Sequence, residues 1–133
     1  MKLQLVKTQA KEFLLQTKAL EDIKPQQKIN INQLNVNLSL PEEEGTTVFA
    51  ILFKLEATAI LEEQLCISCE YWAFFESDSP LTQEFLSSPF TSINAPAIAY
   101  PYLRSFITHS LVNAGYPALY LPTVNFVELA KKS

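Results

Sequence analysis

Cys66 and Cys69 stand in the spacing C-x-x-C, which occurs in redox-active sites and in half of many zinc sites. Apolar and polar residues alternate from Gln64 to Glu76, and this period predicts a strand. Residues three apart on a strand point to opposite faces, so the two sulfurs cannot easily share a metal ion or close a strain-free disulfide. The spacing therefore predicts two buried free thiols.

The other residues that could perform acid–base chemistry are a single histidine and two groups of glutamates. No Ser, Cys or Asp stands near His109 at a spacing that suggests a triad or a metal site, so a solvated or interface role is the better interpretation. Glu42–Glu44 and the pair Glu62 and Glu63 fall in predicted turns with no histidine nearby, which is typical of solvated charges. We expect no catalytic site and no metal site.

The sequence also gives little support for binding of a nucleotide cofactor or of nucleic acid. Gly45 and Gly115 are the only glycines, so neither the G-x-x-x-x-G-K-[ST] loop nor the G-x-G-x-x-G fingerprint can occur. Ten Lys and Arg residues against fourteen Asp and Glu residues give a formal net charge of −4, and the basic residues form no cluster. We expect a protein that is not an enzyme, needs no cofactor and does not bind nucleic acid.

The composition indicates a folded chain, because 48% of the residues are hydrophobic. The length of 133 residues suits a single domain, residues 1–133. The longest apolar runs, Val48–Phe53 and Tyr71–Phe75, fall far short of the ~20 residues that cross a bilayer, so we expect no membrane insertion. Met1–Lys11 lacks the apolar stretch and cleavage site of a secretory signal, which predicts a cytoplasmic location.

Four segments alternate between apolar and polar residues and are predicted strands. They are Leu3–Leu15, Ile29–Leu40, Thr46–Ile60 and Gln64–Glu76. The first could be one strand or two pieces, and residues 10–19 could instead be helical. In the second the apolar parity changes near Gln33, which predicts a bulge or bend there. Pro41 and the glutamates after it, with Gly45, predict a hairpin turn into the third strand.

The segment between Asn94 and Gly115 has the features of a helix of about twenty residues. Asn94 can cap its start, Pro96 is tolerated in a first turn, and Gly115 suits the left-handed position after its end. Pro101 stands inside the pattern and should bend or delay the helix. The remaining segments are predicted as a short helix, an extended crossing and a final short helix, at Thr82–Ser87, Tyr116–Thr123 and Asn125–Lys132. Four strands followed by helices predict an α+β fold with a four-stranded antiparallel sheet.

The run Tyr71–Phe75 is unusual because it is aromatic on both faces of its predicted strand. A strand with one solvated face should be aromatic on one face only. Either a helix or another subunit covers the second face, or an exposed apolar patch there binds polypeptide.

The stretch Pro96-Ala97-Ile98-Ala99-Tyr100-Pro101-Tyr102-Leu103-Arg104 resembles the sequence that opens the long helix in the SecB family of export chaperones. The resemblance continues in the same order and spacing through the crossing segment. It covers Gly115, Tyr116, Pro117, Leu119, Leu121, Pro122, Val124, Asn125 and Phe126. These two matches together are specific for the family.

The resemblance implies a SecB-like fold and a homotetramer, assembled as a dimer of dimers with the long helices between two sheets. It also implies an ATP-independent holding chaperone (a holdase) that binds unfolded polypeptide clients in apolar grooves, for protein export or translocation. Large apolar residues on the strand end, the loop and the crossing segment are the candidates for client contact. They are Tyr71, Trp72, Phe74, Phe85, Phe90, Tyr120 and Leu121.

The family's partner in export is the SecA motor, and two departures put coupling to SecA in doubt. Export members carry an acidic C-terminal tail, whereas this sequence stops at Lys131-Lys132-Ser133. They also carry an acidic residue after a Leu-Cys pair, where this sequence has Ile67 after Leu65 and Cys66. A specialised chaperone of one client, such as an antitoxin, and a scaffold subunit with one folded partner therefore remain alternative hypotheses. An enzyme or small-ligand binder has less support, because convergent polar residues are scarce.

Overall fold

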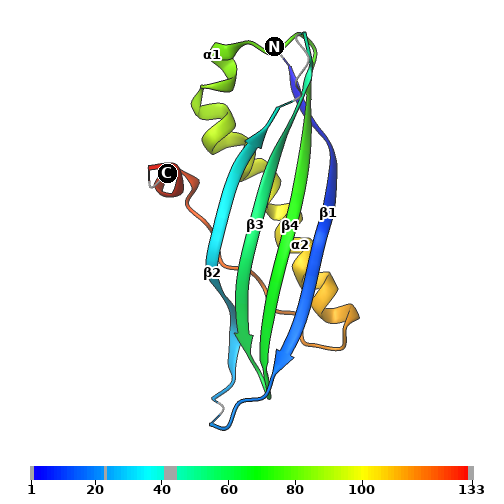
Figure 1. The fold of residues 1–133 in the computed structure, drawn as a ribbon, viewed down its shortest axis with the longest axis vertical. Coiled ribbons are helices and arrows are strands. Elements are labelled where there is room, and N and C mark those ends of the chain that lie inside the picture. Colours follow the sequence, from blue (N-terminus) through cyan, green and yellow to red (C-terminus); the bar gives the residue numbers. More distant parts are fainter. Residues whose placement is uncertain (1, 23, 41–44, 132–133) are drawn as a thin grey trace.

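The computed structural model describes residues 2–22, 24–40 and 45–131, and its main element is an antiparallel sheet (Figure 1). The strands are β1 (Leu3–Lys18), β2 (Gln26–Ser39), β3 (Val48–Ile60) and β4 (Gln64–Ser77). Their order in the sheet is β1-β4-β3-β2, and every neighbouring pair is antiparallel. The predicted α+β fold with a four-stranded antiparallel sheet, a long helix and a short C-terminal helix is confirmed. Because β1 pairs with β4, β2 lies at the opposite edge.

The strand β1 keeps a single buried face over its whole length by means of two irregularities. Its register against β4 shifts between Leu5 and Lys7 and again between Ala10 and Glu12. Each shift reverses the parity of the residues that face the core, so two shifts restore it. This explains why Leu3, Leu5, Phe13 and Leu15 all pack against the core. The helical alternative for residues 10–19 is wrong, because β1 extends to Lys18.

The hairpin between β2 and β3 confirms two predictions. The register shifts between Ile31 and Gln33, which is the predicted bulge. Gly45 has a φ of 76°, a left-handed value that glycine adopts without the steric cost other residues have. Pro41 and Glu42–Glu44, which were predicted to form the turn, lie outside the described residues.

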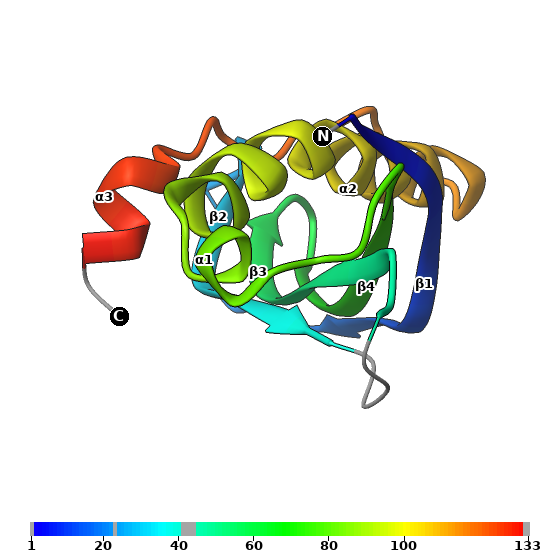
Figure 2. The same cartoon turned by 90° about the horizontal axis from the view of Figure 1, so that it is seen from above.

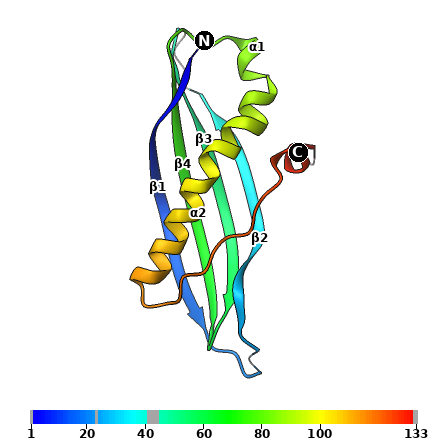
Figure 3. The ribbon, with the colours of Figure 1, turned by 180° about the vertical axis from the view of Figure 1, so that it is seen from behind.

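Helices cover one face of the sheet (Figure 2, Figure 3). They are α1 (Gln83–Leu86), the π-helical segment η1 (Phe90–Asn94), α2 (Ala95–Asn113) and α3 (Phe126–Lys131). The predicted short helices at 82–87 and 125–132 are confirmed as α1 and α3, apart from residue 132, which lies outside the described range. Thr82 caps α1, since its Oγ1 accepts a hydrogen bond from the Phe85 N–H at 3.2 Å. None of these helices is long and apolar enough to cross a membrane.

The start of α2 differs from the prediction and its end agrees with it. Asn94 does not cap the helix, because it has helical backbone angles and makes no side-chain capping bond. The π-helical segment η1 runs directly into α2, so no extended residue precedes the helix. Pro101 does not delay the helix, which begins at Ala95 and continues through it. Gly115, with a φ of 98°, ends the helix as predicted, and the Tyr116 N–H bonds back to the Leu111 carbonyl at 2.9 Å.

The hydrophobic core lies between the sheet and α2, which crosses the sheet diagonally (Figure 3). The buried stripe of α2 contains Ala99, Leu103, Ile107 and Leu111, at spacings of four. These residues face the inner sides of β3 and β4, whose alternate residues are buried from one end to the other. An apolar stripe of α2 therefore packs against the inner face of the sheet.

The segment from Tyr116 to Asn125 returns across α2 without regular secondary structure, as predicted for an extended crossing. Three side chains of α2, one helical turn apart, donate hydrogen bonds to its carbonyl groups. They are the Tyr100 hydroxyl to Pro122 at 2.6 Å, Arg104 Nε to Leu121 at 2.8 Å and the Thr108 hydroxyl to Leu119 at 2.8 Å. Burial raises the pKa of Tyr100 to about 12, so this hydroxyl stays a donor at neutral pH.

Candidate peptide-binding groove

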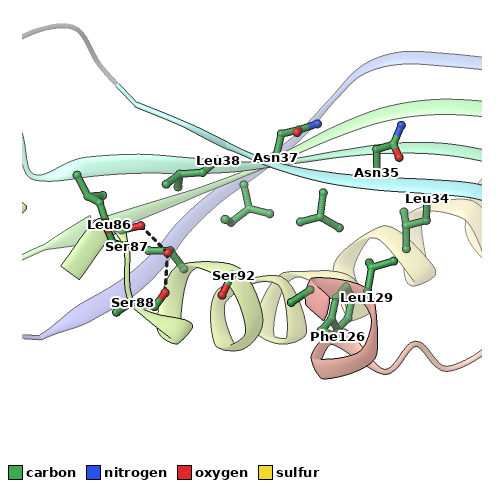
Figure 4. Close-up of a pocket in the computed structure, with 14 residues that line it drawn as sticks. Leu34, Asn35, Asn37, Leu38, Leu86, Ser87, Ser88, Ser92, Phe126 and Leu129 are labelled. Carbon is green, nitrogen blue, oxygen red and sulfur yellow. Dashed lines mark hydrogen bonds between the residues drawn. The ribbon is translucent and has the colours of Figure 1, made fainter. Parts of the chain in front are cut away.

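A groove lies beside β2, between this edge strand and the helical segments next to it (Figure 4). Its volume is about 670 Å³, which is typical of ligand-binding clefts. β2 contributes the five consecutive residues Leu34–Leu38, the α1–η1 segment contributes side chains between Leu86 and Ser92, and α3 contributes Phe126 and Leu129. The groove therefore has one wall of strand and one wall of helix.

The strand wall follows from the sequence pattern of β2. Leu34 and Leu38 point toward the helical side, while Asn35 and Asn37 point away from it (Figure 4). Val36 packs against the core, and all three apolar residues are half-buried. Their partial exposure arises because α2 crosses the sheet diagonally and does not cover the outer edge of β2 (Figure 3). Apolar side chains thus remain accessible along this edge.

The helix wall is held in place by local capping. Asn125 Oδ1 accepts hydrogen bonds from the N–H groups of Val127 at 3.1 Å and Glu128 at 3.2 Å, which fixes the start of α3. Phe126, the first residue of α3, is buried and its ring lies 5.5 Å from that of Tyr100. α3 therefore presents a firmly anchored apolar end to the groove.

The groove is electrically neutral, because none of its lining residues carries a charge. Two hydroxyl groups in its wall donate to nearby carbonyl groups: Thr91 Oγ1 to Leu86 at 2.9 Å, and Ser87 Oγ to Gln83 at 2.9 Å. Such a surface suits an uncharged, largely apolar ligand and offers no group for acid–base catalysis.

The seven residues predicted for client contact do not form one surface. Phe85 and Phe90 lie side by side, with ring centroids 5.5 Å apart, half-buried in the α1–η1 segment that forms the helix wall. Trp72 and Phe74 lie on the opposite face of the sheet, stacked at 5.9 Å. Tyr120 is 57% exposed on the crossing segment, where it lies 5.6 Å from the Arg104 guanidinium.

The other two predicted residues belong to the hydrophobic core. Tyr71 is 6% exposed and packs against Phe106, with ring centroids 5.4 Å apart. Leu121 is 0% exposed beneath the crossing segment. Both are large and apolar, and a single sequence does not distinguish such a residue in a core from one in a groove.

The groove residues on β2 and α3 were not among the predicted contact residues. The available signal was the run Gln33–Ser39, which alternates cleanly and contains neither a charged residue nor a proline. That signal had no meaning until the strand order showed that β2 lies at an edge.

The candidates for chemistry lie apart from the groove. Cys66 and Cys69 are free thiols, as predicted, and they point to opposite faces of β4. Cys69 is buried, whereas Cys66 is only half-buried. Burial raises the pKa of Cys69 to about 12, with smaller contributions from the charges of Glu12 and Glu70. Over the described residues, no group of three or more His, Cys, Asp or Glu side chains could hold a metal ion.

His109 is exposed on the outer side of α2 and contacts Ser105, one helical turn before it. Its Nδ1 lies 3.1 Å from the Ser105 hydroxyl and 2.7 Å from the Ser105 carbonyl oxygen. Ser105 was not predicted as a neighbour of His109, but the carbonyl oxygen as a second partner makes this a local contact within the helix. Glu62 and Glu63 are exposed in the β3–β4 turn as predicted, and Glu42–Glu44 lie outside the described residues.

Fold and groove together define an α+β protein whose long helix covers one face of an antiparallel sheet and whose edge strand borders an apolar groove. The chain belongs to the SecB family, because the family model described as "Preprotein translocase subunit SecB" matches residues 2–133. SecB proteins are chaperones, and the resemblance found in the sequence is confirmed.

Individual relatives agree with this assignment. The chain is 27% identical over 128 residues to the protein-export protein SecB of Anaplasma phagocytophilum, covering 92% of this chain and 79% of that protein. It is 30% identical over 90 residues to that of Paraburkholderia phymatum, covering 66% of this chain and 56% of the relative. An uncharacterized protein of Methanocaldococcus jannaschii is 28% identical over 120 residues, covering 86% and 72% of the two chains.

A solved structure shows the same fold. The SecB-like chaperone of Mycobacterium tuberculosis, in complex with a ChAD peptide from the HigA1 antitoxin, superimposes with a TM-score of 0.68. Its sequence identity is 16%, and the match covers 92% of this chain and 90% of that chain. A protein of unknown function from Streptococcus agalactiae matches with a TM-score of 0.55 and 13% identity, over 92% of this chain and 98% of the other.

Proposed function

We propose that this protein is an ATP-independent holdase that binds unfolded polypeptides through apolar surfaces, without a catalytic step. The observation that carries the proposal is the uncharged groove beside an edge strand, in a chain that belongs to the SecB family. The relatives named protein-export proteins support a role before translocation, which would place the protein in the cytoplasm. Residues 1–133 would act as a single domain.

The mechanism requires only weak contacts. An unfolded client has many apolar segments, and each can occupy one groove or patch at modest affinity. In a homotetramer, which the resemblance implies, several such contacts add by avidity without sequence specificity. Binding the unfolded state and not the native state then holds the client unfolded by mass action.

Client contact would combine the groove with nearby exposed aromatic residues. Phe85 and Phe90 continue its helix wall, and Tyr120 is the most exposed aromatic residue of the predicted set. Trp72 and Phe74 would form a separate contact on the opposite face of the sheet. Tyr71 and Leu121 would reach a client only if the core opened, so the proposal does not depend on them.

The holdase proposal is tested by light scattering of a chemically denatured model enzyme diluted into buffer. We expect the protein to suppress aggregation without ATP and to bind the native enzyme at least tenfold more weakly than the denatured form. The variant Leu38→Asp places a charge in the groove and should reduce suppression, whereas Asn32→Asp, exposed on the same strand but outside the groove lining, should not. Equal affinity for native and denatured enzyme would refute the proposal.

A specialised chaperone of one client is the second candidate. Ile67 in place of the expected acidic residue and the lysines over the outer face of β4 favour it over coupling to SecA. The similar M. tuberculosis chaperone was solved with a peptide from an antitoxin, which supports the same direction. Titration of the protein with purified SecA should then give no measurable binding, and micromolar or tighter binding would favour the export role.

A further inference from the structure

The outer face of the sheet, which no helix of the described residues covers, changes in character along its length (Figure 2). The solvated face of an antiparallel sheet is normally polar throughout. In the middle of this sheet the outward residues of β3 and β4 are indeed polar, and they include Glu56, Thr58 and Ser68. Toward the end where β3 begins, the outward residues are instead apolar: Val48, Ala50, Leu52, Trp72 and Phe74.

The strand register makes these five residues one continuous surface, the outer apolar block. Ala50 is opposite Phe74, and Leu52 is opposite Trp72. The two aromatic rings stack with their centroids 5.9 Å apart. Ala50 is only 4% exposed although no helix covers it, so the larger side chains around it close over its position. A contiguous apolar surface of this kind is typical of an interaction site.

Two lysines of β1 lie over the rings of this block. The ammonium group of Lys7 is 5.6 Å from the centroid of the Phe74 ring, and that of Lys11 is 4.1 Å from the centroid of the Trp72 ring. Within the part of the chain that the structure describes, neither lysine forms an ion pair. Cation–π contacts at exposed sites are weak, so both ammonium groups are available to a carboxylate from another molecule.

Three glutamates adjoin the block without cancelling the charge over its rings. Glu70 accepts a hydrogen bond from Trp72 Nε1 at 3.1 Å and is opposite Lys54, which balances its charge. Glu12 is opposite Glu70, beyond the rings, and Glu76 stands near the end of β4. The carboxylates thus lie at the margins of the block, whereas the two charges over its aromatic rings are both positive.

We propose that the outer apolar block docks an acidic segment of a partner protein, one that presents carboxylates beside large apolar side chains. The carboxylates would pair with Lys7 and Lys11 and move their ammonium groups off the rings. The apolar side chains of the partner would then contact Leu52, Trp72 and Phe74. The lysines would therefore act as a cover that an acidic partner displaces and a basic one does not.

This docking is separate from the groove along β2 and does not depend on the holdase function. It would compete with the client contact proposed for Trp72 and Phe74, so a docked partner would restrict clients to the groove. A second copy of this chain is a less suitable occupant. Its own block would place Lys7 and Lys11 against the same two lysines, and like charges repel.

Tryptophan fluorescence tests the proposal directly, because Trp72 is the only tryptophan. The probes are two peptides of about ten residues without tryptophan, one alternating leucine with glutamate and the other alternating leucine with lysine. We expect the acidic peptide to shift the emission to shorter wavelengths, since the indole loses contact with water. It should bind at least tenfold more tightly than the basic peptide at low ionic strength, and added salt should weaken it.

The uncharged groove has no means of distinguishing the two peptides by charge, so the comparison reports on the outer face. Equal affinity for both peptides, or tighter binding of the basic one, would overturn the proposal. Calorimetric binding of the acidic peptide without a change in Trp72 emission would place its site elsewhere and would overturn it too. None of these results bears on aggregation suppression, which tests the holdase function separately.

Two double variants of equal net charge give an independent measurement. Lys7→Glu with Lys11→Glu reverses the charges over the block. Lys18→Glu with Lys28→Glu reverses two exposed charges at the other end of the sheet, where β1 ends and β2 begins. The first should bind the acidic peptide at least tenfold more weakly than the unmodified protein, and the second should retain its affinity. Equal losses in both would overturn the proposal, and if the first does not fold, the peptide comparison on the unmodified protein decides.

Discussion

The contacts of Trp72 explain how β4 can carry aromatic residues on its outer face as well as on its inner face. Its Nε1 donates to Glu70 Oε2 at 3.1 Å, and the Lys11 ammonium lies 4.1 Å from its ring centroid. Lys7 lies 5.6 Å from the neighbouring Phe74 ring in the same way. The aliphatic stems of the two lysines can cover these rings while their charges stay in water. The outer aromatic pair is therefore half-buried without a helix over it.

The buried thiol of Cys69 should make the stability of the fold depend on pH. Burial raises its pKa from 9.0 to about 12, so the folded state retains the proton more strongly than the unfolded state. The contribution of the protonated Cys69 thiol to folding stability is fully present below pH 9 and is lost as the pH rises toward 12. The free energy of unfolding should therefore fall between pH 9 and pH 12. Urea denaturation at several pH values measures this, and Cys69→Ala should show a smaller decrease.

Thiol labelling at pH 8 provides the control for this prediction. Half-buried Cys66 should react with a chromogenic disulfide reagent in the native protein, and Cys69 should react only after denaturation. Equal native reaction rates of Cys66→Ser and Cys69→Ser variants would contradict the burial argument.

The elements show which parts of the structure local sequence determines. Alternation placed all four strands, and even the bulge near Gln33 was visible as a change of parity. Asn94 failed as a cap because η1, which no local pattern announces, continues into α2. The groove could not be predicted, because β1 pairs with β4 across the whole chain and only this pairing leaves β2 at an edge. Long-range pairing, and not local propensity, therefore positions the candidate site.

The crossing segment, Tyr116 to Asn125, should depend for its position on its hydrogen bonds to α2. It is attached to α2 through side-chain hydrogen bonds, of which the one from buried Thr108 to the Leu119 carbonyl is 2.8 Å long. Thr108→Val keeps the shape but leaves this carbonyl unpaired, which should lower the free energy of unfolding by about 1–3 kcal/mol. The matched control Thr123→Val, exposed on the same segment, should change it by less than about 0.5 kcal/mol. Equal effects in urea denaturation would show that the bond does not hold the segment.

Three apolar side chains are exposed on the outer side of α2. Ile98, Tyr102 and Val112 are exposed, and their spacing places them on the side of α2 that faces away from the sheet. Exposed apolar residues in such a row are typical of a subunit interface. The SecB resemblance implies that long helices lie between two sheets in a dimer of dimers, and this row would then be covered.

Native mass spectrometry tests this expectation. A homotetramer should have a mass of about 60 kDa, since one chain has a mass of 15.0 kDa. The double variant Ile98→Lys and Tyr102→Lys places two charges in the row and should shift the population to dimers or monomers, because burying unpaired charges is costly. Gln83→Lys, exposed on α1, adds a charge away from this side and should leave the mass unchanged. A tetramer that persists in the double variant would place the interface elsewhere. None of the three residues in this row lines the groove along β2, so the dissociated form should still bind a single client segment while losing avidity for a long one.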